Sequence, residues 1–319
     1  MNLGLHRFAV VVAAATLLLI AAGGLVTSTE SGLSVPDWPT TYGQNPFTFP
    51  ISKWVGGIRF EHTHRLIAST VGLLTVVLAI WLARREPRAW VRRLGYAALA
   101  AVVAQGVLGG LTVLFLLPTA VSVAHACLAQ TFFCLVVTLA VVTSPAWVEA
   151  RPAKADRTAR VAAATVAAVF LQLLVGAVMR HTKAGLAIPD FPLALGRVVP
   201  PLTSFPVAIH FTHRVGAVVV FSFAVACVLE ARRSRRPGLQ RTAALLGSLV
   251  VVQIGLGALT VLSRKDVALT TSHVVVGALV LGSSLVLALQ SRRTVRLRAV
   301  TRTSDDAAHH RSRPRVISR

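Results

Sequence analysis

The sequence QGVLGGLT at residues 105–112 recurs as QIGLGALT at residues 253–260, which lie 148 positions further along the chain. A second stretch, SGLSVPDWP at residues 31–39, recurs as AGLAIPDFP at residues 184–192. Both copies of this second stretch keep the order Gly-Leu, small residue, aliphatic residue, Pro-Asp, aromatic residue, Pro. Such self-similarity over most of a chain indicates two copies of one structural unit.

The composition is typical of a membrane protein. The 319 residues are 55% hydrophobic, and their mean hydropathy is +0.70. Apolar runs of about 18 residues or more indicate membrane-spanning helices, and runs of this length exclude a β-barrel. The expected fold class is therefore an all-α integral membrane protein with eight transmembrane helices. The eight runs are centred near Leu18, Leu73, Val103, Leu135, Val169, Val219, Val250 and Ala278.

The net charge of +22 is concentrated in particular connections. Of the 33 Lys and Arg residues, 24 lie before the first run, after the second, fourth and sixth runs, or in the C-terminal tail. The positive-inside rule therefore predicts that both termini are cytoplasmic. The basic surplus is explained by this topology and by attraction to anionic membrane lipids. A nucleic-acid partner is not expected, because the basic tail contains no aromatic residue.

Two units of four spans account for most of the chain. Residues 8–142 are expected to form an N-terminal four-helix bundle, and residues 161–290 a C-terminal one. A cytoplasmic linker at 143–160 joins them, and the basic segment 291–319 is expected to be a disordered cytoplasmic tail. Since each unit has an even number of spans, the two tandem bundles form a parallel pseudo-twofold repeat. Many secondary transporters have inverted repeats instead.

Four histidines occupy equivalent positions in the two units: His64 and His125 in the first, His213 and His273 in the second. A single histidine at membrane depth commonly makes a helix–helix hydrogen bond, but polar groups there are also functional candidates. All four are expected in the outer half of the membrane: His64 and His213 in the first turns of their spans, His125 and His273 on the order of 10 Å deep. Two imidazoles alone are too few for a zinc or copper site. Because a porphyrin supplies four more nitrogens, the pattern predicts two bis-histidine haem sites.

Charged residues next to the histidines differ between the units. Arg65 and Arg214 each follow a histidine, and they are candidates either for haem propionate contacts or for snorkelling to lipid phosphate. Glu61 precedes His64 by three residues, where the second unit has His210. An acidic residue at a helix N-terminus is favourable without any function. The asymmetry nevertheless predicts an acid–base group in the first site only.

The cysteines do not form a recognisable site. Cys127, Cys134 and Cys227 all lie in apolar segments. Free cysteines in such segments behave as small hydrophobic residues. No disulfide framework is therefore expected.

With these features the chain resembles the haem A synthases of the COX15/CtaA family, over about residues 8–290. The resemblance is carried by FEHTHR at 60–65, HFTHR at 210–214, the Pro-Asp-Trp-Pro segment, and the histidines of the fourth and eighth spans. It implies that a haem b cofactor is bound through its iron by His213 and His273. It also implies that His64 and His125 hold the substrate haem, and that Glu61 acts in catalysis.

The resemblance implies a reaction as well. The family oxidises the C8 methyl group of haem O to a formyl group, by successive hydroxylations and loss of water, and so makes haem A for terminal oxidases. A multi-pass protein of the cell (plasma) membrane is then expected, surrounded by membrane lipids. Haem O synthase and cytochrome oxidase assembly components are candidate partners. The electron donor stays open.

One departure from the family concerns the first outer loop. Many bacterial members carry two cysteines flanking the Asp-Trp-Pro segment, where this chain has Val35 and Thr41. Disulfide chemistry or transient haem attachment through such a pair is therefore not available to this protein.

The residues alone, without the resemblance, lead only to a two-haem membrane protein with unequal sites. A bis-histidine di-haem electron carrier of the quinol-linked cytochrome b type, which does not modify haem, is the alternative function. A haem transporter is a third hypothesis. The parallel repeat and the shared depth of the four histidines disfavour the transporter.

Overall fold

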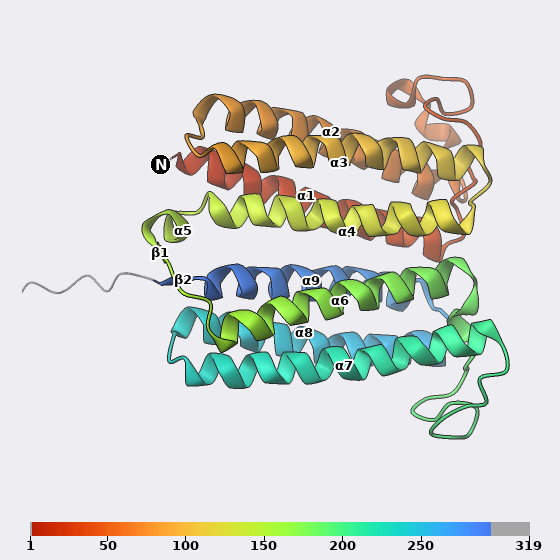
Figure 1. Ribbon diagram of the computed structural model, residues 1–319. Coiled ribbons are helices and arrows are strands. Elements are labelled where there is room, and N and C mark those ends of the chain that lie inside the picture. The colour runs from red at the N-terminus through yellow and green to blue at the C-terminus, as the bar shows by residue number, and fades with distance from the viewer. Residues whose placement is uncertain (1, 295–319) are drawn as a thin grey trace, which may run out of the picture.

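The protein consists mainly of long helices that run alternately up and down (Figure 1). The computed structural model describes residues 2–294, so most of the predicted tail lies outside the described residues. Within the described part, eight helices are long and apolar enough to cross a membrane, which confirms the predicted class and number of spans. They are α1 (Leu3–Ser28), α2 (Ile58–Arg85), α3 (Ala89–Leu114), α4 (Thr119–Val142), α6 (Arg157–His181), α7 (Phe205–Arg233), α8 (Pro237–Leu262) and α9 (Val267–Ser291).

Contacts between helices fall into two groups. In the first group, α1 and α3 each pack on both α2 and α4. In the second, α6 and α8 each pack on both α7 and α9. Each group encloses its own main cluster of buried apolar side chains. In Figure 1 the first group lies above the second.

Helix α9 joins the two groups, because it packs on α1 and α4 as well as on α6 and α8. Small residues of α9 allow close approach on both sides: Gly277 faces Leu173 of α6 and Gln253 of α8, whereas Gly282 faces α4 of the other group. A Cβ added to Gly282 would lie 3.1 Å from Cε1 of Phe133 on α4. Small residues at helix interfaces let backbones approach closely in membrane proteins.

The two ends of the helix array differ. At one end, here called the loop end, lie the long connections 29–57 and 182–204 (Figure 1). They contain short helical turns: η1 (Pro46–Thr48), η2 (Ile51–Lys53) and η3 (Ala184–Leu186). At the other end, here called the arginine end, lie the short α2–α3 and α7–α8 connections, α5 (Pro145–Glu149), β1 (Arg151–Pro152) and β2 (Arg293–Thr294).

Regular structure extends into both segments that were expected to be linkers or tail. Helix α6 already begins at Arg157, because the side chain of Asp156 accepts a hydrogen bond from the amide of Ala159 (2.8 Å) and so caps the helix. Strands β1 and β2 form a two-residue antiparallel pair. The linker therefore contacts the residues that follow α9 at the arginine end.

Candidate functional site

The four repeated histidines all lie close to the loop end. Three of them, His64, His125 and His273, are the seventh residues of α2, α4 and α9. His213 is the ninth residue of α7. At a rise of about 1.5 Å per residue, the imidazoles lie on the order of 10 Å inside the helix ends, the depth predicted for His125 and His273. His64 and His213 lie deeper than the first turn that was predicted for them, because α2 already begins at Ile58 and α7 at Phe205.

Each imidazole packs against a glycine of the preceding helix. A Cβ added to any of these glycines would come within 3.0–3.1 Å of the ring Cε1. The four contacts join Gly23 to His64, Gly109 to His125, Gly176 to His213, and Gly257 to His273. Each imidazole therefore occupies space that a side chain at the facing glycine would fill.

A residue one turn before each glycine completes this arrangement. Gln105 lies 3.3 Å from Nε2 of His125 and donates to its carbonyl oxygen (3.0 Å), and Gln253 likewise lies 3.3 Å from Nε2 of His273. These glutamine amides therefore lie directly beside the imidazole rings.

The corresponding residues of α1 and α6 differ from one another. On α6, Gln172 contacts Nδ1 of His213 (3.1 Å) and donates to its carbonyl oxygen (2.7 Å). On α1 the equivalent residue, four positions before Gly23, is Leu19. The imidazole of His64 therefore has no side-chain amide from α1.

The second histidine pair is arranged as two ligands of one metal would be. The ring centroids of His213 and His273 are 6.3 Å apart. Two imidazoles on opposite sides of one metal have ligating nitrogens about 4 Å apart, which corresponds to ring centroids about 6 Å apart. His64 and His125 are also close enough to interact electrostatically. The structure thus brings together the residues of each predicted pair.

The donor set fits a planar metal chelate better than a bare metal ion. Three imidazoles, those of His64, His125 and His273, have a buried Nδ1 without a hydrogen-bond partner among residues 2–294. Burying an unpaired polar atom is costly, so a missing ligand is a natural partner. No group of three or more His, Cys, Asp or Glu side chains that could hold a metal ion occurs in the described part. A ligand that brings its own equatorial nitrogens, such as haem, therefore fits these residues.

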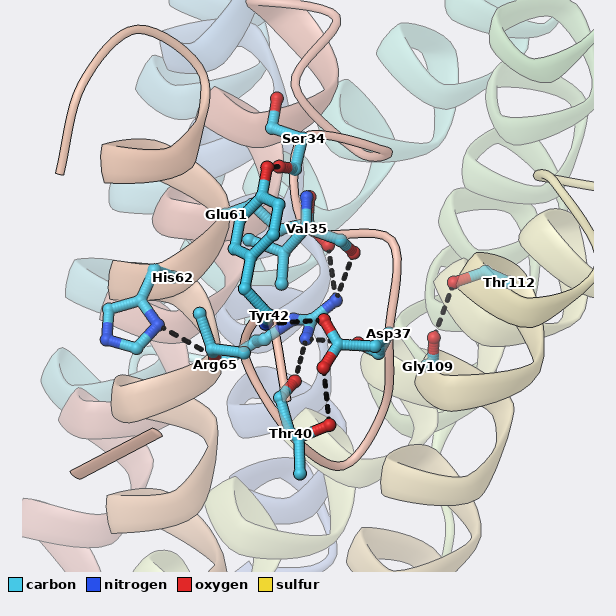
Figure 2. A network of polar contacts seen from close by, with 11 residues as sticks. Ser34, Val35, Asp37, Thr40, Tyr42, Glu61, His62, Arg65, Gly109 and Thr112 are labelled. Carbon is cyan, nitrogen blue, oxygen red and sulfur yellow. Dashed lines mark hydrogen bonds and ion pairs between the residues drawn. The ribbon is translucent and has the colours of Figure 1, made fainter. Parts of the chain in front are cut away.

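Two arginines clamp the long loops onto the histidine-bearing helices. Figure 2 shows the first of them, Arg65. Arg65 donates to the carbonyl oxygens of Val35 (2.9 Å), Asp37 (2.7 Å) and Thr40 (3.0 Å). It also forms an ion pair of 2.6 Å with Glu61. These bonds involve both terminal nitrogens of the guanidinium group.

Arg214 has the same role at the second loop. It donates to the carbonyl oxygens of Ile188 (3.0 Å), Asp190 (2.7 Å) and Leu193 (2.8 Å). Each arginine is therefore largely engaged by the loop of its own half, a use that the sequence did not suggest.

Glu61 and His210 occupy equivalent places and hold equivalent loop atoms. The carboxylate of Glu61, which is buried, accepts a hydrogen bond from the amide of Val35 (2.8 Å). The amide of Ile188 points in the same way at Nδ1 of His210 (3.3 Å). Both side chains therefore anchor a loop, but only the Glu61 anchor carries a negative charge and an ion pair.

Asp37 and Asp190 shape the turns of these loops. Burial raises the pKa of Asp37, but hydrogen bonds from the amides of Gly43 and Tyr42 and from the Thr40 hydroxyl outweigh it, so the pKa lies below the ordinary value. Backbone amides likewise lower the pKa of Asp190. Both carboxylates are therefore ionised at neutral pH, and their contribution to loop stability is lost only in acid, as pH falls through the lowered pKa.

The first loop also covers the end of α3 beside His125. A Cβ added to Gly110 would lie 2.5 Å from Cδ2 of Trp38, so the indole lies directly on this glycine. Gly110 follows Gly109, the glycine in contact with His125. The aromatic residue at the centre of the loop thus closes the loop end above the first histidine pair.

His62 is buried in the first loop rather than at a histidine pair. Its ring packs against Phe49 and Trp54, at centroid distances of 5.2 and 4.7 Å. Its Nδ1 lies 3.2 Å from the hydroxyl of Thr41. Thr41 and Val35, the positions where many family members have cysteines, are both fully buried. They thus serve here as packing residues of the loop.

A cationic side chain connects the two groups of helices near the loop end. Arg180 of α6 donates to the carbonyl oxygen of Gly24 (3.1 Å) and to the hydroxyl of Ser28 (3.0 Å) on α1. Thr271 of α9 also donates to Ser28 (3.2 Å). Within residues 2–294, Arg180 forms no ion pair with a carboxylate. It lies one turn beyond Gly176, the glycine in contact with His213.

Sequence reasoning missed several of these residues. Arg180, Gln172, Gly23 and Gly176 were not singled out. A detectable signal existed, because the spacing Gln-x-x-x-Gly occurs in α3, α6 and α8 and faces a histidine each time. This repeated spacing was harder to recognise because α1, the fourth helix of the set, has Leu19 in place of the glutamine.

Comparison with known proteins agrees with this arrangement. The family model of COX15-CtaA, described as cytochrome oxidase assembly protein, matches residues 6–54 and 57–285. The chain belongs to this family. Among curated relatives, the heme A synthase of Symbiobacterium thermophilum is 34% identical over 74% of this chain and 79% of its own length. That of Halalkalibacterium halodurans is 29% identical over 86% and 93%, and that of Rhizorhabdus wittichii 27% over 88% and 92%.

Family membership and the eight apolar helices together identify a multi-pass membrane protein. The match spans both groups of helices and all four repeated histidines. Haem involvement follows at the level of the family and its named relatives.

Proposed function

We propose that the protein is a haem A synthase, an oxidoreductase that converts the C8 methyl group of haem O to a formyl group. The observation that carries the proposal is the pairing of buried histidines, each seated on a glycine, in a chain that belongs to the COX15-CtaA family. Several curated relatives are named heme A synthase. A bound haem supplies the redox chemistry at the iron.

We further propose which pair holds which haem. His213 and His273 both have glutamine partners, which suits a resident haem b cofactor. Beside His64, α1 has Leu19 where α6 has Gln172, and α2 has Glu61 where α7 has His210, so the two sites are not equivalent. His64 and His125 are therefore assigned to haem O, and Glu61, on the same helix as His64, to proton transfer near the reacting methyl group.

The other charged residues position the loops and the haem carboxylates. Arg65 and Arg214 keep the loops closed over the sites and limit the access of water. We retain both as candidate propionate contacts, because a guanidinium has five N–H donors and the loop carbonyls do not use all of them. Arg180 adds a positive charge, without a carboxylate partner among residues 2–294, for the same purpose.

We also propose that the two helix groups are tandem four-helix bundles, residues 8–142 and 161–290, related by a parallel pseudo-twofold repeat. Equivalent loop contacts of Arg65 and Arg214 support this relation. The arginine end, where α1 begins and α9 ends, faces the cytoplasm by the positive-inside rule, as the sequence predicts for both termini. The haem sites then lie in the outer half of the plasma membrane.

The proposed function is tested by coexpressing the full chain with a haem O source and extracting the pigments. Haem A is expected in the membranes, together with haem b that copurifies with the protein. Mass analysis of the extracted haems identifies the formyl product. Recovery of haem O alone beside a fully loaded protein would refute the proposal.

The same extraction tests the alternative, a di-haem electron carrier. Such a carrier would bind two permanent b haems and yield no modified haem. The difference between Glu61 and His210 favours the synthase, because a simple carrier has no need for an acid–base group beside only one of its haems.

The glycine contacts make a separate prediction. Gly257→Val is expected to lower haem b content about tenfold or more, since disturbing a ligand's surroundings costs 10–100-fold in metal affinity. The added Cβ alone would lie 3.1 Å from Cε1 of His273. Haem b per chain is measured from the pyridine haemochrome spectrum. Gly255→Val, which adds the same three carbons at an exposed position of α8 where a new Cβ would meet nothing within 4 Å, is the control and should retain its haem b.

A further inference from the structure

Two buried hydroxyl groups occupy equivalent places next to the histidines of α4 and α9. Ser122 precedes His125 by three residues, and Thr270 precedes His273 by three. Both are the fourth residues of their helices, so each lies about 4.5 Å nearer to the loop end than its histidine and on the same helix face. The two hydroxyls are therefore related by the repeat in the same way as the histidines.

Neither hydroxyl has a hydrogen-bond partner within residues 2–294, although the Oγ of Ser122 and the Oγ1 of Thr270 are buried. The whole of Ser122 is only 3% exposed. A buried hydroxyl in a helix commonly donates to the carbonyl oxygen four residues earlier, as Thr75 (2.7 Å) and Thr165 (2.8 Å) do. Because an unpaired buried hydroxyl costs free energy, a ligand that lies beside each histidine is the natural partner.

The partner should be a group that both haems have, because the hydroxyl is repeated in both sites. The ring nitrogens of a haem bind the iron, and haem b has no formyl or hydroxyl side group. The polar side groups common to haem b, haem O and haem A are the two propionate carboxylates. A carboxylate oxygen accepts a hydrogen bond from a hydroxyl, and such a charge-assisted bond is stronger than one between neutral groups.

A carboxylate at this depth also needs a positive charge nearby, and Arg180 supplies one. Its guanidinium donates to Ser28 (3.0 Å), to which Thr271, the neighbour of Thr270, also donates (3.2 Å). Arg180 is also close enough to His273 to interact with it electrostatically. The level of the two hydroxyls, between the histidines and the loop end, is therefore suited to anionic groups.

We propose that Ser122 and Thr270 each donate a hydrogen bond to a propionate carboxylate of the haem in their own site. This inference rests on the proposed function for the identity of the two haems. It gives α4 and α9 a carboxylate-binding residue in addition to a histidine. The C8 methyl group of haem O lies next to one propionate on the macrocycle, so a hydrogen bond from Ser122 to that carboxylate also positions the reacting carbon.

The first test compares haem O with its dimethyl ester, in which both carboxylates are neutral. Each ligand is titrated optically into the full-length protein with haem b bound, and the dissociation constant of a variant is compared with that of wild type for the same ligand. Ser122→Ala is expected to weaken haem O binding about tenfold or more, because hydrogen bonds to charged groups contribute most. For the ester the loss should be about threefold or less, because a neutral oxygen accepts a weaker bond.

Two further variants control for a loss of packing. Ser122→Thr keeps the hydroxyl and should bind haem O as wild type does, since the second site has threonine at this position. Ser222→Ala removes a hydroxyl from an exposed position of α7, where it donates to the carbonyl oxygen of Val218 (3.0 Å). It should change the affinity for neither ligand.

Thr270→Val tests the second site without a ligand titration. Removing the hydroxyl leaves the carboxylate with more negative charge, which stabilises ferric iron. The midpoint potential of the bound haem b should therefore fall. Thr270→Ser keeps the hydroxyl and should keep the wild-type potential, which a general loosening of the fold would not explain.

An equal loss of affinity for haem O and its ester in Ser122→Ala would overturn the inference, because a buried water or the macrocycle would then be the partner. Unchanged haem O binding in Ser122→Ala would also overturn it. If Ser122→Ala fails to fold, the comparison at Thr270 decides, and an unchanged potential in Thr270→Val overturns the inference. Failure of the proposed function is separate: the wild-type chain would then make no haem A, while the two ligands could still be compared.

Discussion

Replacing His213 or His273 by alanine is expected to abolish haem b binding and haem A formation together. Each imidazole would be one of the two side chains that hold the second haem, and the described part has no group of three or more His, Cys, Asp or Glu that could compensate. With one imidazole removed, a single side chain would be left to hold the haem. We expect haem b per chain to fall more than about tenfold, which the pyridine haemochrome spectrum measures.

Replacing His64 or His125 by alanine is expected to abolish haem A formation without abolishing haem b binding. Haem b should stay bound, since the second pair is intact, while haem A falls below detection in extracted pigments. His6→Ala is the matched control, because His6 lies at the arginine end, where it contacts the carbonyl oxygen of Ala140 (3.0 Å). If His64→Ala lost haem b and His213→Ala kept it, the assignment of the two sites would be reversed.

Glu61→Gln is expected to lower haem A formation about 100-fold or more while haem b stays bound. General acid–base groups contribute about 10²–10⁴-fold to a rate, and glutamine cannot transfer the proton. It can still accept the hydrogen bond from the amide of Val35, so the first loop keeps this anchor. The variant therefore separates the chemical role of the carboxylate from its structural role. Haem A per chain is the measurement.

Two further variants complete this test. Glu61→Ala also removes the loop anchor and leaves Arg65 without its ion-pair partner, so proteolysis within residues 35–57 should become faster. His210→Ala removes only the corresponding anchor at Ile188, and it should loosen the second loop with a smaller loss of haem A. Full haem A formation by Glu61→Gln would show that the residue serves only to hold the loop.

Much of the architecture could be predicted from the sequence because it depends on local properties. The length and apolarity of a segment decide whether it spans a membrane, and all eight predicted spans are present in the described part. The four histidines were found because a polar ring in an apolar run is conspicuous, and its repetition more so. The family resemblance was carried by short motifs that the family match then covered.

Other features of the site could not be predicted, because they depend on which helix faces which. The sequence suggested Arg65 and Arg214 as propionate contacts, but their use as clamps on loop carbonyls requires the folded path of each loop. The sequence distinguished Glu61 from His210 by charge. In the structure, however, the amide of an equivalent loop residue points at each of the two side chains. That shared role is visible only in three dimensions.

The sequence by itself determined the membrane class, the number of spans and the repeated histidines, because these follow from hydrophobicity along the chain and from residue identity. Only the tertiary structure decided how each histidine is held. Leu19 is one of many leucines in an apolar helix, and nothing local distinguishes it. Leu19 matters because its position on α1 is equivalent to that of Gln172 on α6. Both residues lie one turn before a glycine that contacts a histidine of the next helix. Contacts between helices arise from packing, and packing is a property of the whole fold.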